Sequence, residues 1–482
     1  MILALIILSV AVLILILLSR SARVMNFYTT LYLLSALVLA VKTLITERLP
    51  IYYLQNNYFF IDSLSIFEII LTIVIFLLAA IYAEGYVESL TASGELNPKN
   101  IKLFYVAFNV LLLAVILAFS SNNLALLWIF AELTTVLSAI LIVILNAKEN
   151  ITAALKYVFI ASTAMLFSFI GLIFMFAISK LDGAEATLNW DLLLQRAAEL
   201  SPQLFLFSFV LIFVGFAAKS GIVPFHTWLP AAYSKAPSDV SVLLSGSITN
   251  IGIYAIIRIY AIAQHTSSQP FISKMLLFFG IASMAVAAVS MIVRTNVKKL
   301  IAFSSVENMG FLLIGISIGS PISIFWVLFH TLAHSLNKAL LFFSAGIIHR
   351  QYNSIKNEFI HNALKLQPLA SWGLIVGSIS IIGMPLFPLF VSKFFILSQL
   401  SGVSKIILFS VLSLLLIASS SFAWFFINLF GNIKEKELPK FKAPASMKIP
   451  IIILIILLLI LGLFIPASIK SMLHAIVSEL RI

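Results

Sequence analysis

The stretch VLIFVGFAAKSGIVPFHTWLP, residues 210–230, is apolar enough to enter a membrane, yet it carries a lysine near its centre. An ionisable side chain in the hydrocarbon core costs several kcal/mol, so Lys219 needs a reason to be there. Gly221 and Pro224 follow within five residues, and a proline inside a helix removes a backbone donor and clashes with the preceding turn. The stretch predicts a membrane helix that breaks beside a buried lysine.

The whole chain has the composition of a protein that crosses the membrane many times. Of its 482 residues, 62% are hydrophobic and 10% are charged, and the mean hydropathy is +1.14. Soluble domains hold about 25% charged residues. The sequence contains no cysteine, which excludes disulfides, thiolate zinc sites and iron–sulfur clusters on this chain. It also lacks a glycine-rich nucleotide-binding loop, so no cofactor is expected on it.

Apolar runs that can cross about 30 Å of hydrocarbon recur from end to end. They are predicted at 1–19, 27–46, 60–83, 101–120, 123–145, 151–179, 203–223, 239–263, 271–293, 299–319, 322–347, 367–400, 405–431 and 449–469. The first run lacks a basic start and a small-residue cleavage site, so we interpret it as a retained span and not as a signal peptide. The sequence predicts an all-α polytopic membrane protein of about fourteen transmembrane helices.

The basic residues fall mostly in alternate loops. One set of loops holds Arg20, Arg23, Lys99, Lys102, Lys148, Lys235, Arg294, Lys298, Lys299, Arg350, Lys356, Lys434, Lys436, Lys440 and Lys442. The opposite loops hold mainly Arg48, Lys180, Arg196, Lys274 and Lys405. Cytoplasmic loops are enriched in lysine and arginine, so both termini are predicted to lie outside. The net charge of +12 therefore indicates a membrane orientation and not binding to nucleic acid.

A second interrupted helix lies in the other half of the chain, in ISIIGMPLFPLFVSKFFIL (379–397), where Lys393 follows a glycine and two prolines. Two broken helices, each with a buried lysine, are typical of transporters built from internal repeats. Glu132 lies two spans before the helix of Lys219, and Glu307 lies two spans before that of Lys393. We expect two inverted five-helix repeats, spans 4–8 (residues 101–265) and 9–13 (266–431), between a three-helix segment (1–100) and a C-terminal helix (432–482).

Glu132 lies near the middle of its predicted span, in LALLWIFAELTTVLSAILIVIL (124–145). A buried carboxylate requires a cation or a proton. The candidate cations are Lys219 and Lys156, so a structural ion pair between helices and a proton-exchanging pair are both consistent with the sequence.

Three proton-binding groups recur four residues apart in FHTLAHSLNKALLFF (329–343): His330, His334 and Lys338. This spacing places them on one face of a helix. Two histidines so spaced can bind a metal, but no glutamate accompanies them and the lysine repels a cation. They can instead be core histidines bonded to neighbouring helices, or a proton wire, because histidine titrates near neutral pH. We favour the proton wire.

Several motifs in this order resemble the large antiporter-like subunits of respiratory complex I, Mrp-type sodium/proton antiporters and group 4 membrane-bound hydrogenases. The clearest are FIDSLS (60–65), LWIFAEL (127–133), AKSGIVPFHTWLPAAYSKAPSDVSVLLSG (218–246), NVKKLIAFSSVENMG (296–310), FHTLAHSLNKALLFFSAG (329–346) and GMPLFPLFVSKFF (383–395).

The resemblance implies a path of buried residues through the membrane middle. Glu132 and Lys219 would form the input pair, His330, His334 and Lys338 the central relay, and Lys393 the terminal lysine, with Glu307 and Lys156 as further members. Span eight departs from the pattern, because it carries Ser245 and Asn250 where relatives often place histidine or lysine.

The resemblance also implies partners and location. We expect a proton-translocating subunit in a prokaryotic cell membrane, beside other membrane subunits, lipid and peripheral redox subunits, and closest to the hydrogenase type. A subunit of an Mrp-type sodium/proton antiporter is the alternative. An enzyme with its own redox centre is disfavoured because the chain lacks cysteine.

Overall fold

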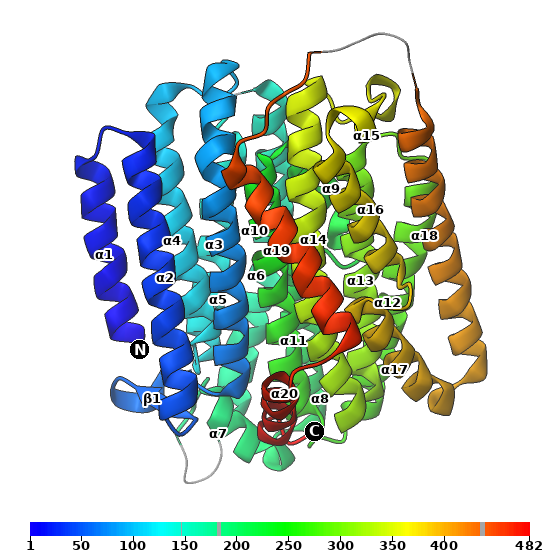
Figure 1. Ribbon diagram of the computed structural model, residues 1–482. Coiled ribbons are helices and arrows are strands. Elements are labelled where there is room, and N and C mark those ends of the chain that lie inside the picture. Colours follow the sequence, from blue (N-terminus) through cyan, green and yellow to red (C-terminus); the bar gives the residue numbers. More distant parts are fainter. Residues whose placement is uncertain (146, 181–184, 434–438) are drawn as a thin grey trace.

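The computed structural model describes residues 1–145, 147–180, 185–433 and 439–482. Lys434 and Lys436, two of the lysines assigned to the cytoplasmic loops, lie outside the described residues. A small hairpin, β1 (Ile51–Tyr53) and β2 (Phe59–Ile61), pairs antiparallel with Ile51 opposite Ile61. The other elements described are helices (Figure 1).

Helices make up most of the described chain. In chain order they are α1 (Ile2–Leu18), α2 (Ala22–Thr46), α3 (Ser63–Ala92), α4 (Ile101–Phe119), α5 (Leu124–Val143), α6 (Lys148–Ile178), α7 (Trp190–Gln195), α8 (Pro202–Ser220), α9 (Trp228–Lys235), α10 (Ser238–Leu243), α11 (Thr249–Ala263), α12 (Gln269–Ile292), α13 (Val297–Ile318), α14 (Pro321–Tyr352), α15 (Ala363–Leu366), α16 (Pro368–Ile382), α17 (Pro388–Val403), α18 (Lys405–Gly431), α19 (Ala445–Leu463) and α20 (Ala467–Glu479). A π-helical turn, Leu244–Ile248, joins α10 to α11.

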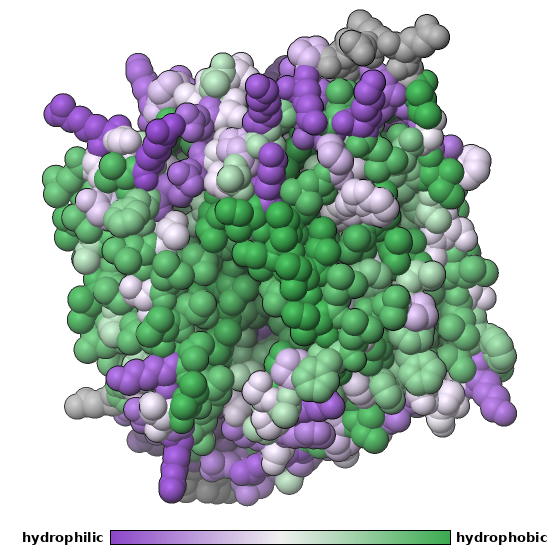
Figure 2. All heavy atoms as spheres, viewed as in Figure 1, coloured by the Kyte–Doolittle hydropathy of each residue, from purple (hydrophilic) through white to green (hydrophobic). Residues whose placement is uncertain are grey.

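On the face that Figure 2 shows, apolar residues form a broad band across the middle of the bundle, and polar residues gather at its two ends. Within the described residues, twelve helical segments are long and apolar enough to span a membrane. Adding the shorter α1 and the interrupted pair α16–α17 gives the fourteen spans that the sequence predicts. Both termini lie toward the same end of the bundle (Figure 1). The predicted fold class, a multi-pass all-α membrane protein, is confirmed.

The two broken helices also occur where predicted. The first, α8, ends at Gly221, which adopts a left-handed φ of 73°, and the chain resumes as α9. This left-handed φ strains most residues that have a Cβ, and a Cβ here would also require Leu229 to move, because it would lie 2.3 Å from Leu229 Cδ1; glycine avoids both costs. The second, α16, ends at Gly383 (φ 89°) and resumes as α17. Each break leaves helix-end carbonyl groups inside the membrane, and these need donors from elsewhere.

The last predicted span is too long by several residues. It is expected from the sequence to reach residue 469, but α19 ends at Leu463 and a separate helix, α20, begins at Ala467. Pro466 explains the difference, because a proline lacks the backbone N–H that would continue the helix and disfavours helical geometry in the residue before it. The apolar side chains of Leu473 and Ile476 in α20 are buried against the bundle.

Candidate functional site

Six ionisable side chains from the predicted path are buried inside the bundle. Each is at most 5% exposed, and they come from α8, α13, α14 and α17: Lys219, Glu307, His330, His334, Lys338 and Lys393. Charged side chains are rare at such positions unless they are paired or have a function.

Lys219 lies in the last turn of α8 and reaches across to α5. Its Nζ donates to the carbonyl oxygen of Ala131 at 2.8 Å and to Thr135 Oγ1 at 2.7 Å. Glu132 lies between these two on α5, but it accepts a hydrogen bond from Ser162 on α6 and is only half-buried. Among the described residues, Lys219 and Glu132 form no direct ion pair. Lys219 therefore contacts the helix that carries Glu132, but its amine is held by neutral oxygens of Ala131 and Thr135 and not by the carboxylate.

Lys156 lies apart from the buried residues. Its side chain is exposed on α6, in a groove of about 430 Å³ that also contains Lys148, Lys235 and Lys299. The structure therefore places it on the surface near the lysine-bearing end of the bundle.

Lys338 is held in the centre of the second half. Its Nζ donates to the carbonyl oxygen of Ile301 at 2.8 Å and to Ser304 Oγ, both on α13. Ser304 also lines a cavity of about 10 Å³ together with Glu307 and Lys393. A cavity of that size holds about one water molecule. One serine therefore connects Lys338 to the terminal lysine and its carboxylate partner.

The two histidines of the α14 column have different surroundings. The ring of His330 hydrogen-bonds through Nδ1 to Ser392 Oγ (2.9 Å) and through Nε2 to Asn308 Oδ1 (3.0 Å). Both nitrogens are occupied, which fits a core histidine that joins α13 to α17 and leaves none free for a metal. His334 has no hydrogen-bond partner on either nitrogen within the part of the chain described. A buried imidazole without protein partners is a place where ordered water binds.

Lys393 and Glu307 form a buried ion pair. The distance between Lys393 Nζ and Glu307 Oε1 is 3.5 Å. Lys393 Nζ also donates to the carbonyl oxygen of Ile381 at 2.9 Å, in the last turn of α16. This carbonyl is one of the unpaired acceptors at the helix break, where the helix dipole favours a cation. The helix break therefore supplies a hydrogen-bond acceptor for Lys393. From the sequence, only the Gly-Met-Pro motif that causes the break could be seen.

Span eight presents neutral polar side chains to the interior. Ser245, in the π-helical turn, shares a 3.1 Å hydrogen bond with Ser305 of α13. Asn250 donates to Glu68 Oε2 at 3.3 Å and to Ser335 Oγ at 3.1 Å. Glu68 lies inside the predicted span 60–83 but is not among the path residues that the resemblance implies. Its place beside α11 and α14 emerges only from the tertiary structure.

Arg258, another charge inside the predicted spans, has a structural partner. Its guanidinium donates to both carboxylate oxygens of Asp62 at 2.6 Å, and its Cζ lies 4.3 Å from the ring centroid of Trp190. A bidentate, desolvated pair of this kind joins α11 to the start of α3.

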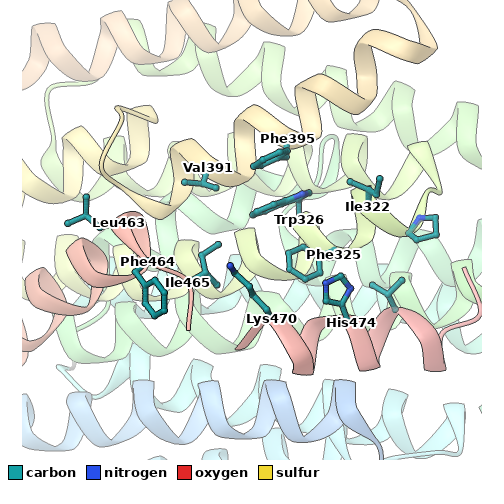
Figure 3. Close-up of a pocket in the computed structure, with 13 residues that line it drawn as sticks. Ile322, Phe325, Trp326, Val391, Phe395, Leu463, Phe464, Ile465, Lys470 and His474 are labelled. Atoms are coloured by element: carbon teal, nitrogen blue, oxygen red, sulfur yellow. The ribbon is translucent and has the colours of Figure 1, made fainter. Parts of the chain in front are cut away.

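An apolar groove of about 640 Å³ lies beside the helix of the terminal lysine (Figure 3). Trp326 of α14 and Phe395 of α17 stack in its wall with ring centroids 4.2 Å apart, and Lys470 and His474 of α20 line its edge. Phe395 lies two residues after Lys393, so the groove and the ion pair share helix α17.

Comparisons with solved structures agree with this fold. The membrane-bound sulfane sulfur reductase, an archaeal respiratory membrane complex, contains a chain that superposes with a TM-score of 0.88 at 21% identity, covering 99% of this chain and 96% of that one. The Mrp complex from Dietzia sp. DQ12-45-1b contains another, with a TM-score of 0.84 at 19% identity and the same coverage.

Sequence comparisons identify the family. A hydrogenase-4 component F homolog from Methylacidiphilum infernorum is 29% identical over 382 residues, 79% of each chain. A Na(+)/H(+) antiporter subunit from Alkalihalophilus pseudofirmus is 28% identical over 363 residues, 74% of this chain and 72% of that one. Residues 121–419, more than half of the chain, match the family described as "NADH:quinone oxidoreductase/Mrp antiporter, TM". This chain therefore belongs to the NADH:quinone oxidoreductase/Mrp antiporter transmembrane family.

Proposed function

We propose that this chain is the proton-translocating membrane subunit of a multi-subunit redox complex of the group 4 hydrogenase or complex I type. The observation that carries the proposal is the set of buried lysines, histidines and carboxylate in α8, α13, α14 and α17, because ionisable side chains inside a membrane bundle are costly and mark ion pathways. Electron transfer takes place in partner subunits, since this chain has no cysteine for an iron–sulfur cluster.

The contacts support a hand-over mechanism. Lys219 and Lys338 are each held by neutral oxygens, so each can lose its proton without leaving a buried carboxylate unpaired. Lys393, in contrast, is held by Glu307 and a helix-end carbonyl, which favour its charged form. A proton arriving at Lys338 adds positive charge near Lys393, and this repulsion is strong because the interior has a low dielectric constant. The terminal lysine then releases its proton toward the second face.

The proposal includes an orientation. With the lysine-bearing loops on the cytoplasmic side, both termini lie outside, as the positive-inside rule predicts. Protons would enter near Glu132 and Lys219 and leave near Lys393. Other membrane subunits and lipid would cover the apolar sides of the bundle.

Proton pumping in vesicles tests the proposal. The complex is prepared with wild-type chain, with Lys338→Met, and with Lys42→Met as a matched control that removes an exposed lysine of α2. A pH-sensitive dye follows acidification after the electron donor is added. We expect pumping in wild type and control, and loss of pumping in an assembled Lys338→Met complex. Wild-type pumping by Lys338→Met would refute the proposal.

The second candidate function is a subunit of a sodium/proton antiporter. The similarity to the antiporter protein of Alkalihalophilus pseudofirmus supports it. The same vesicles distinguish the two: a sodium pulse without electron donor should leave the internal pH unchanged in a redox-driven pump. A pH change that follows the sodium pulse would favour the antiporter.

A further inference from the structure

The path has a gap between its two halves. Lys219 serves the first half and Lys338 the second. Span eight connects the elements that carry them, because α11 packs against α8 and the π-helical turn Leu244–Ile248 before it packs against α14. The residues of this span at the gap, Ser245 in the turn and Asn250 in α11, are buried but neutral. Neither can hold a transferred proton as an ionised group.

Glu68 of α3 lies at this gap. Its side chain is 3% exposed, and its Oε2 accepts a 3.3 Å hydrogen bond from Asn250 Nδ2. The same amide donates to Ser335 Oγ at 3.1 Å, and Ser335 follows His334 in α14. Glu68 therefore reaches the relay helix through a single asparagine.

The carboxylate of Glu68 differs from that of Asp62 at the start of the same helix. Asp62 is neutralised by Arg258 through two hydrogen bonds. Glu68, in contrast, forms no ion pair with any basic side chain among the described residues. A permanently charged carboxylate without a cation is expensive inside a membrane protein. A carboxyl group that is protonated between transfers bears that cost only while it is ionised.

Several buried polar atoms without partners occur on Glu68's own helix, on its hydrogen-bond partner and on the relay helix. Thr72 Oγ1 lies one helical turn further along α3, and Asn250 Oδ1 lies at the contact itself. In the part of the chain that is described, both are buried without a hydrogen-bond partner, as are both ring nitrogens of His334. Such groups are typical hosts of ordered water. The π-helical turn Leu244–Ile248 just before α11 is of a type often found at functional sites.

We propose that Glu68 is a proton carrier that joins the two halves of the path, supplying from α3 an ionisable group at the place where span eight offers only Ser245 and Asn250. This inference rests on the function proposed above. The carboxylate accepts a proton from the Lys219 side through water and becomes a neutral carboxylic acid. The acid then gives the proton to the imidazole of His334 or to the amine of Lys338, and the carboxylate is restored. Asn250 positions the carboxyl group, and the hydrogen bond to Ser335 fixes the amide of Asn250.

The test compares Glu68→Gln with Glu68→Asp in the vesicle assay. Glutamine keeps an oxygen to accept from Asn250, so a purely structural acceptor would tolerate it. We expect Glu68→Gln to assemble and to slow redox-driven pumping by about a hundredfold or more, in the range that loss of a positioned acid or base produces. Glu68→Asp should keep most pumping with a shifted pH profile. Adding Asn250→His to Glu68→Gln should restore part of the rate.

The outcomes separate this inference from the proposed function. Wild-type pumping by Glu68→Gln, with pumping abolished by Lys338→Met, would overturn the role of Glu68 alone. Wild-type pumping by both variants would overturn the proposed function itself. Should Glu68→Gln fail to assemble, the pH profile of Glu68→Asp decides: a shift supports the carrier, and an unchanged profile overturns it.

Discussion

The Lys393–Glu307 pair offers the sharpest test of whether the buried charges move protons or hold helices together. At 3.5 Å and an effective dielectric constant of about 20, the attraction between the two charges is about 5 kcal/mol. Lys393→Met leaves Glu307 buried without a cation, which should destabilise the protein by about 3–5 kcal/mol. Lys393→Met/Glu307→Gln has neither charge and should recover most of that stability.

Transport should follow a different order from stability. A relay needs a group that binds and releases a proton, so both Lys393→Met and the double variant should lose pumping. Lys393→Arg keeps the charge beside Glu307 and the donor for Ile381, yet guanidinium does not release its proton. It should therefore be stable and inactive. Thermal unfolding of the purified complexes measures stability, and a pH-sensitive dye in vesicles measures pumping.

A structural ion pair predicts the opposite result for the double variant. If the pair only joins α13 to α17, restoring stability should also restore pumping. Wild-type pumping by an assembled Lys393→Met/Glu307→Gln complex would refute the reasoning.

Other contacts give further predictions. Glu132→Gln should assemble normally but lose pumping, because the amide cannot exchange a proton with the path; unaltered pumping in vesicles would remove Glu132 from the mechanism. His334→Ala should slow pumping without loss of fold, since alanine suits a helix, and metal analysis of the wild-type complex should find no stoichiometric zinc. Asp62→Ala should lower the free energy of unfolding by about 3–5 kcal/mol, because it leaves Arg258 buried and unpaired; an unchanged melting temperature would contradict this. Burial, with the nearby charge of Asp62, raises the pKa of Glu479, so docking of α20 should strengthen as the pH falls into the acidic range. Amide exchange in α20 should show this dependence in wild type and lose it in Glu479→Gln.

The architecture could be predicted from the sequence because a bilayer imposes strong local rules. A span must be apolar over about twenty residues, and its backbone must bond internally, so length and composition locate most helices. The breaks at Gly221 and Gly383 were also predictable, since they follow from local backbone chemistry. The predicted end of α19 was wrong because the span was extended to residue 469 on its apolar composition, although Pro466 ends the helix before that point.

The sequence by itself determined which ionisable residues enter the membrane, because each charge in an apolar run is visible without any knowledge of packing. Only the tertiary structure decided their partners. It gave Lys393 a carboxylate and a helix-end carbonyl, placed Lys156 on the surface, and set Glu68 against Asn250, 182 residues away. Such contacts depend on how helices distant in sequence pack together, and hydropathy carries no record of which helix faces which.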